Sequence, residues 1–356
     1  MALNKNDLVQ LGKIAMTANP SAPTAYSFNG TNLTAEAVNE TFREELNALA
    51  ATHADYRENK NLIFSIMEQI IDDVLPKKVS ERYSELAETK VFAQGDKPEF
   101  RRNRTNNRRA KQFITRVGLA GRYEVFKLGK KTESFQVPTS ALGGAAQIGL
   151  EEFLDGRINM PEVLSYVIEG IDEVIQEEVV KAMEGAINQL PAANHVAVNG
   201  FHAPTMDRLI AIAAAYGTPV IYCTREFAVR MIPESGWVTE SMKEQIWNNG
   251  WLGNYKGTKV VILEQGYTDE THTQKVIDPA HCWIIATGAS GKPVYIAMEG
   301  ATLMKEHEND DWSRDIQVYK KVGVVAMLNN SVCHYQDTSL STAIDTSVPE
   351  QYQPKA

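Results

Sequence analysis

The clearest pattern in the chain is a helical repeat of apolar residues between Pro161 and Leu190. Their spacing of three or four residues places them on one face of a helix. The residues of this stripe are Leu164, Val167, Ile168, Ile171, Ile175, Val179, Met183, Ile187 and Leu190. Pro161 suits the first helical turn, and Pro191 follows the end. About thirty residues at 1.5 Å each would span roughly 45 Å, so the pattern predicts a long strut.

The first hundred residues show a second helical pattern, interrupted by turns. Apolar residues repeat at helical spacing from Leu62 to Val74. Pro76 predicts the end of that helix, because proline lacks the amide that a helix interior needs. Residues 19–23 and 28–34 are rich in turn-forming residues. We therefore interpret residues 1–94 as an N-terminal helical arm.

The pattern changes to a strand-like one after the arm. Residues 113–128 are β-prone around a glycine-containing turn at Gly118 to Gly121, which predicts a hairpin. Further strand-like segments at 133–137 and 147–154 are separated by Pro138 and the Gly143-Gly144 pair. Residues 95–156 are therefore predicted to form an extended two-stranded projection.

Short, mixed elements follow the long helix, and the fold class that they predict is α+β. Helices are expected at 205–216 and 225–231, and Ser241 to Glu244 has the spacing of a capping box. The predicted strands are 219–223, 259–264, 282–287, 293–298 and 316–328. The last of these is long enough to run between two subdomains.

Composition narrows the class of protein. The chain has 356 residues, 43% of them hydrophobic, which is enough for two or three domains. Its net charge of −9 argues against a protein whose main task is to grip nucleic acid. No apolar run reaches the length of a membrane helix, and the N-terminus lacks a secretory pattern, so we expect synthesis in the cytoplasm. Three cysteines with apolar neighbours predict reduced, buried thiols.

Motifs for nucleotide binding and nucleophilic catalysis are incomplete. Gly288 to Pro293 has glycines at the wrong spacing for a phosphate loop, and Pro293 replaces the required hydroxyl residue, so a turn is expected. No nucleophile elbow is present. The sequence therefore predicts no catalytic residue and no cofactor.

A metal site is the weakest of the chemical alternatives. His272, Asp278, His281 and Cys282 come nearest to a ligand set. His281 and Cys282 are adjacent in a strand-like segment, so their side chains should point to opposite faces. The spacing also lacks the paired ligands of a zinc site. Residues 306–311 are acidic but lack the pattern of a calcium loop. We predict no metal ligand.

One charge pattern suggests a contact between subunits. A basic run lies in the predicted projection of an acidic chain: Arg101, Arg102, Arg104, Arg108, Arg109 and Lys111. The long helix is acidic, and the candidate acceptors on it are Glu169, Asp172, Glu173 and Glu177. We hypothesise that the basic projection of one subunit lies over the acidic helix of its neighbour. A solvated loop or a nucleic-acid contact are the alternatives.

Three segments carry a resemblance to a known family. Gly250–Leu263 reads GWLGNYKGTKVVIL, where a glycine-aromatic-x-glycine step leads into a buried strand. Lys292–Gly300 and Trp312–Leu328 read as closing strands. With the order of arm, projection, long helix and α+β domain, they resemble the tailed-bacteriophage major capsid proteins with the Hong Kong ninety-seven-type fold. The resemblance covers about residues 95 to 340.

That resemblance implies a division of the chain and a structural function. It implies an arm at 1–94, an extended loop at 95–156, a spine helix starting the peripheral domain at 157–199, a mainly axial domain at 200–300, a return strand at 301–340, and a tail at 341–356. Identical subunits would assemble in hexamers and pentamers into an icosahedral virion shell, built in the host cytoplasm.

The resemblance also implies partners and leaves rivals open. Portal, scaffold and decoration proteins are the expected partners, and packaged DNA would lie nearby without specific binding. Gly143 and Gly144 are candidate hinge residues for shell expansion. The closest rival is an encapsulin-like nanocompartment shell, and a metal-dependent enzyme is a distant one.

Overall fold

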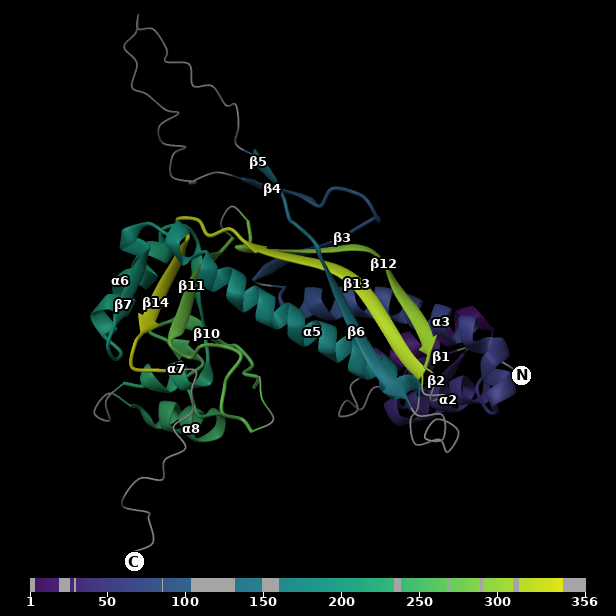
Figure 1. Ribbon diagram of the computed structural model, residues 1–356. Helices are drawn as coiled ribbons and strands as arrows, with labels where there is room; N and C mark the ends of the chain where they lie inside the picture. The colour runs from purple at the N-terminus through teal and green to yellow at the C-terminus, as the bar shows by residue number, and fades with distance from the viewer. Residues whose placement is uncertain are drawn as a thin grey trace, which may run out of the picture. The chain divides into compact units, whose positions relative to one another are not determined.

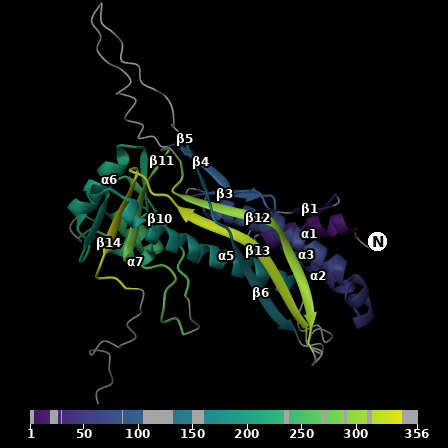
Figure 2. The same ribbon diagram turned by 45° about the horizontal axis from the view of Figure 1, so that its top comes forward.

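A computed structural model describes residues 4–18, 26–28, 30–84, 86–103, 132–148, 160–233, 238–267, 269, 271–288, 291–309 and 314–341 (Figures 1 and 2). The chain divides into two compact units. Unit 1 comprises Met1–Phe100, Phe135–Glu178 and Tyr295–Val325. Unit 2 comprises Arg101–Ser134, Val179–Val294 and Ala326–Ala356. Each unit is therefore assembled from segments that lie far apart in the sequence.

Three helices form the N-terminal part of unit 1, as predicted for the first hundred residues. They are α1 (Lys5–Thr17), α2 (Ala35–Ala48) and α3 (His53–Arg82), and a small hairpin of β1 (Tyr26–Phe28) and β2 (Thr31–Leu33) lies between the first two. Asn4, Thr34 and Thr52 cap the helices with their side chains. Gly12 allows close packing, because a Cβ there would lie 2.8 Å from the Phe42 ring.

The predicted end of a helix at Pro76 is wrong, because α3 continues to Arg82. The apolar face also continues past the proline, with Val79 fully buried and Tyr83 buried. Tertiary burial of this face outweighs the backbone hydrogen bond that proline removes.

A four-stranded sheet completes unit 1. Its order is β3 (Ala87–Phe92), β12 (Val294–Glu308), β13 (Arg314–Ala326) and β6 (Ser140–Ile148). The strands β4 (Glu99–Asn103) and β5 (Thr132–Gln136) form a separate pair, which confirms the strand predicted at 133–137. The predicted hairpin at 113–128 lies outside the described residues.

Two predicted strand boundaries in this sheet are wrong. β6 runs through Gly143 and Gly144, which pair with Tyr319 and Val318 of β13 in ordinary extended conformation. Glycine needs no turn when a long partner strand supplies its hydrogen bonds. β12 continues to Glu308, beyond the expected end at Met298, and lies between β3 and β13 in the sheet.

The predicted long helix is confirmed as α5 (Met160–Gly185), and Leu164, Ile175 and Val179 of its apolar stripe are buried. Its end is earlier than the expected Leu190. After Gly185 the chain forms two short 3₁₀ turns, η2 (Ile187–Gln189) and η3 (Ala192–Asn194). An apolar stripe alone does not separate an α-helix from the tighter turns that follow it.

Unit 2 is built on a six-stranded mixed sheet. Its order is β7 (His195–Val198), β14 (Val332–Asp337), β11 (His281–Thr287), β8 (Thr218–Cys223), β10 (Thr258–Ile262) and β9 (Asn254–Tyr255). β11 is antiparallel to both neighbours, whereas β8–β10 and β7–β14 are parallel. The strands β7 and β14 were not predicted. The α+β class is confirmed.

Three helices accompany this sheet: α6 (Ala203–Ala214), α7 (Arg225–Arg230) and α8 (Glu240–Asn249). The expected capping box at Ser241 is wrong. Thr239 caps α8 instead, since its side chain accepts from the Met242 amide. A threonine two residues earlier competes for the same role, and either fits the local pattern.

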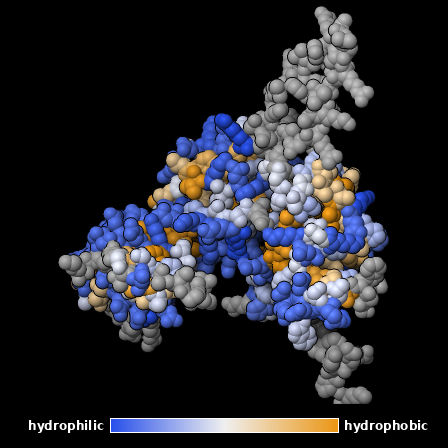
Figure 3. Space-filling view, turned by 180° about the vertical axis from the view of Figure 1, so that it is seen from behind, coloured by the Kyte–Doolittle hydropathy of each residue, from blue (hydrophilic) through white to orange (hydrophobic). Residues whose placement is uncertain are grey.

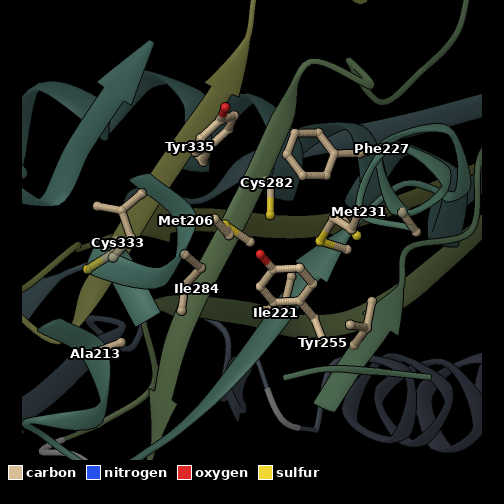
Figure 4. Close-up of a cluster of buried hydrophobic side chains, with 14 residues drawn as sticks. Met206, Ala213, Ile221, Phe227, Met231, Tyr255, Cys282, Ile284, Cys333 and Tyr335 are labelled. Atoms are coloured by element: carbon tan, nitrogen blue, oxygen red, sulfur yellow. The ribbon is translucent and has the colours of Figure 1, made fainter. Parts of the chain in front are cut away.

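The core of unit 2 contains the three cysteines, two of which, Cys282 and Cys333, are labelled in Figure 4. Cys223, Cys282 and Cys333 are buried and free, as predicted. They pack among aromatic and aliphatic side chains such as Phe227 and Tyr335. Burial raises the pKa of the Cys333 thiol to about 12, so it stays protonated and unreactive in the folded state.

Candidate subunit-contact surface

The exposed side of α5 carries an acidic face. Glu162, Tyr166, Glu169 and Glu173 are exposed and recur at intervals of three or four residues. This spacing places them on one side of the helix. Tyr166 is 72% exposed, which is unusual for a large aromatic side chain. Aromatic side chains are enriched at protein interfaces, so Tyr166 is a candidate contact residue.

An apolar groove of about 540 Å³ lies between β6 and α5, beside this acidic face. The strand lines it with residues 141–146, which are mostly glycine and alanine. The helix contributes Val163, Tyr166, Val167, Gly170, Ile171 and Val174. Small side chains on the strand leave the space open, so this β6–α5 groove can receive apolar groups.

The strand that borders the groove is also a sheet edge. β6 pairs with β13 on one side, and among the described residues no strand pairs with its other side. Edge strands usually carry charges or proline that block further pairing. Residues 141–146 contain neither. The outer edge of β6 is therefore suited to pairing with an added strand.

Apolar side chains also reach the surface elsewhere in the chain (Figure 3). Trp247 of α8 is 90% exposed, and Leu303 of β12 is 51% exposed. Neither borders the β6–α5 groove. No helix among the described residues combines the length and hydrophobicity of a membrane span.

The predicted acidic acceptors divide into two kinds. Glu169 and Glu173 are exposed, and Glu177 is half-buried. Asp172 is only 2% exposed and lies 2.7 Å from Arg82 and 3.6 Å from Lys78 of α3. Its carboxylate is used inside the subunit, so burial removes Asp172 from the predicted contact set.

The predicted basic residues lie mostly beyond what the structure describes. Arg101 and Arg102 belong to β4, and Arg101 is exposed. The other four lie outside the described residues: Arg104, Arg108, Arg109 and Lys111. The hypothesis that this run contacts a neighbouring subunit stays a prediction.

Part of β12 is covered by α3 where a neighbouring strand would otherwise pair. The Glu68 carboxylate accepts from the Met304 amide at 2.7 Å, and the Asp72 carboxylate accepts from the Thr302 amide at 2.9 Å. Lys320 of β13 also donates to Asp72, at 2.6 Å. Two carboxylates one helical turn apart thus satisfy two amides of β12, which a neighbouring strand would otherwise pair. Sequence reasoning did not identify this cap.

The predicted metal candidates do not gather into one site. His272 lies on an exposed loop against Tyr267, and Cys282 faces the unit 2 core. Asp278 does lie beside His281, with 3.5 Å between Oδ2 and Nε2. No group of three potential ligands in the described part of the chain is arranged to hold a metal ion.

Histidines from other strands do gather around His281. His334 lies next to it, and His195 lies on the far side of His334. The sequence pattern missed this group because β7 and β14, which carry His195 and His334, were not predicted.

Several solved structures resemble the chain at low sequence identity. A phage-related protein from Bordetella bronchiseptica RB50 is 11% identical with a TM-score of 0.48, and the match covers 78% of this chain and 98% of that one. The capsid of Ralstonia phage GP4 is 10% identical with a TM-score of 0.43, covering 74% and 88%. The holo-SrpI encapsulin complex from Synechococcus elongatus PCC 7942 is 10% identical with a TM-score of 0.43, covering 77% and 92%.

A protein-family comparison is more specific. A comparison of the sequence with curated proteins found no match. Residues 10–334 match the family described as "SPbeta prophage-derived putative capsid protein YonB". This span includes most of both units and every feature of the surface described above. The chain therefore belongs to the YonB family of prophage capsid proteins, which confirms the assignment to phage capsid proteins made from the sequence.

Proposed function

We propose that this chain is the major capsid protein of a phage-type particle, and that identical copies build an icosahedral shell around a genome. The family match over residues 10–334 carries the proposal. The role is structural: copies bury apolar surface at repeated interfaces, and closed symmetry ends growth. Hexamers and pentamers are the expected building units.

The β6–α5 groove and the acidic face of α5 are the proposed receiving surface for a sister subunit. The groove offers apolar burial, and the edge of β6 offers backbone hydrogen bonds. Glu169 and Glu173 complement the basic run that begins at Arg101. Exposed ion pairs contribute only about 0 to 1 kcal/mol each, so the charges would select register while apolar burial supplies affinity.

Expression of the chain alone tests the proposed function. Negative-stain microscopy and sedimentation should show capsomer rings or closed particles. A folded monomer at every concentration would contradict self-assembly. Particles filled with a host protein instead of nucleic acid would favour the encapsulin-like alternative.

Charge reversal tests the proposed contact. Replacing Arg108 and Arg109 by Glu should slow assembly, and the further changes Glu169→Lys and Glu173→Lys should restore part of the rate. Sedimentation velocity measures both effects. Unchanged assembly in the arginine variant would remove the ionic contact from the proposal and leave the self-assembly proposal standing.

Gly143 and Gly144 are proposed as the pivot of the projection during shell expansion. Both lie in β6 and border the groove. A Cβ at Gly144 would meet no atom within 4 Å, and one at Gly143 would lie 3.5 Å from the Val318 carbonyl oxygen, so alanine fits at both positions in the subunit. If the pivot is real, particles of the double variant Gly143→Ala, Gly144→Ala, which adds only one methyl group at each position of the groove, should form but fail to expand. Normal expansion would reject the pivot.

Portal, scaffold and decoration proteins are proposed partners, with assembly in the host cytoplasm. The net charge of −9 supports packaged DNA that lies near the shell without tight binding. Co-purification from infected or induced cells would identify these partners.

A further inference from the structure

Three histidines from three neighbouring strands of unit 2 form one hydrogen-bonded chain. His334 of β14 lies between His195 of β7 and His281 of β11. Nδ1 of His334 is 2.9 Å from Nδ1 of His195, and its Nε2 is 2.7 Å from Nδ1 of His281. The ring centroids are 5.1 Å and 4.9 Å apart. Because His334 is fully buried, both of its nitrogens depend on these two neighbours.

The number of hydrogen positions limits the positive charge that the three hydrogen-bonded histidines can hold. Each of the two nitrogen–nitrogen contacts needs one hydrogen, because one nitrogen must donate and the other accept. Three neutral imidazoles satisfy both contacts. One added proton is also accommodated, at the outer nitrogen of His195 or His281, or on His334 with both neighbours accepting. A second added proton places two hydrogens in one contact, which breaks it.

A carboxylate beside His281 favours the first added proton. The Asp278 carboxylate lies 3.5 Å from Nε2 of His281. Glu184 at the end of α5 also faces Asp278, and burial together with that charge raises the pKa of Glu184, while Lys181 opposes the rise. The Trp283 ring covers His334, with centroids 4.3 Å apart.

His334, the middle histidine of the three, is strongly biased toward its neutral form. Burial, with the two neighbouring histidines adding to it, lowers the pKa of His334 to about 2. Burial also lowers the pKa of His281, although Asp278 opposes this. Unfolded histidines have pKa values near 6.5, so opening the sheet here takes up protons whenever the pH falls below that value.

We propose that His195, His334 and His281 form an acid-sensitive latch, which keeps β7, β14 and β11 together with at most one added proton and opens when a second proton binds. The latch joins β14, near the end of the described residues, to its two neighbours in the sheet. These are β7, which follows α5 in the sequence, and β11. It acts within one subunit and does not depend on the proposed shell.

The buried thiols report opening directly. Cys282 and Cys333 are the sequence neighbours of His281 and His334 and are fully buried on the core side of the same strands. Separation of β14 from β11 would expose them. We would treat the full chain with 4,4′-dithiodipyridine, which reacts with thiols in acid, and locate labelled cysteines by peptide mapping between pH 7 and pH 4.

The test depends on how steeply the rate of thiol labelling rises as the pH falls. Below the ordinary histidine pKa, the open state of the wild type holds at least two protons more than the closed state, so the labelling rate, divided by that of a free thiol at the same pH, should rise about 100-fold per pH unit. In the double variant His195→Gln, His281→Gln only His334 can take a proton, and the rise should fall to about 10-fold. His307→Gln, an exposed histidine of β12, is the matched control and should behave like the wild type.

Two results would overturn the latch. One is equal steepness in the wild type and the double variant. The other comes from imidazole nitrogen NMR of the wild type, which needs no substitution and so remains valid if the double variant fails to fold. If two of the three histidines carry a positive charge while both thiols stay protected, the closed latch holds more protons than the proposal allows.

Discussion

At the scale of single residues, unit 1 contains an ion pair whose lysine is fully buried and whose aspartate is partly exposed. Lys320 is 1% exposed, and its ammonium donates to Asp72 and to the Gly300 carbonyl. The Asp72 carboxylate also accepts from Thr302. A buried ammonium without its carboxylate would keep its desolvation cost and lose the attraction that offsets it.

We therefore expect Asp72→Ala to lower the free energy of unfolding by about 3 kcal/mol. The neighbouring Asp73, whose partner Lys13 is partly exposed, is the matched control. Asp73→Ala should cost under about 1 kcal/mol. Urea unfolding of the two variants measures the difference, and equal losses would show that burial of Lys320 is unimportant.

Glu299 provides a pH-dependent prediction. Its carboxylate accepts from the Thr139 hydroxyl at 2.6 Å, from the Gly95 amide at 3.1 Å and from Lys321 at 3.4 Å, and these bonds lower its pKa. A lowered carboxyl pKa stabilises the fold above the ordinary value near 4.5, and this contribution is lost as the pH falls through the folded-state pKa.

Thermal unfolding of the wild type and of Glu299→Gln should therefore differ most at neutral pH and converge in acid. A difference that is constant with pH would mean that the carboxylate charge plays no part. This comparison leaves the histidines unchanged, so it is independent of the latch.

The sequence held an overlooked signal for the buried lysine. Val318, Lys320 and Val322 alternate in β13, so the strand period places them on one face. Two valines on that face indicate a buried lysine. Its partner Asp72 lies 248 positions away, and no local pattern predicts such a pairing.

At the scale of elements, α3 takes the place of a strand along part of β12. Glu68 and Asp72 each satisfy one β12 amide. Removing the Glu68 carboxylate should leave the Met304 amide without its acceptor and open this edge.

Glu68→Ala should make the Met304 amide exchange with solvent at least about 10-fold faster, consistent with the loss of roughly one hydrogen bond. Glu68→Gln keeps a carbonyl acceptor at the same place and should preserve most of the protection. Hydrogen exchange read by NMR or mass spectrometry distinguishes the two. Equal protection in both variants would show that α3 does not close the edge.

Element boundaries were predicted less well than element types. Apolar periodicity identified α5 and three of the six strands of the unit 2 sheet, β8, β10 and β11, because those elements each bury one continuous face. It failed at Pro76 and at Gly143-Gly144, where tertiary partners override local preference. The short strands β7 and β14 were missed, since few residues of either form a periodic pattern.

At the scale of the whole molecule, the order of elements carried more information than any motif. Arm, projection, long helix and mixed domain predicted a capsid protein, and the family match agrees. Only part of the candidate subunit-contact surface was predicted from the sequence. Glu169 and Glu173 are exposed as expected, whereas the apolar groove depends on pairing of β6 with β13, which sequence does not encode locally.

The central claim is that sister subunits complete the surface formed by β6 and α5. Hydrogen exchange of residues 140–148, compared between dilute free subunits and assembled particles, tests it most directly. We predict that alternate amides of β6, those on the edge away from β13, exchange rapidly in free subunits and become protected in particles. Particles that form while these amides exchange as fast as before would contradict the claim.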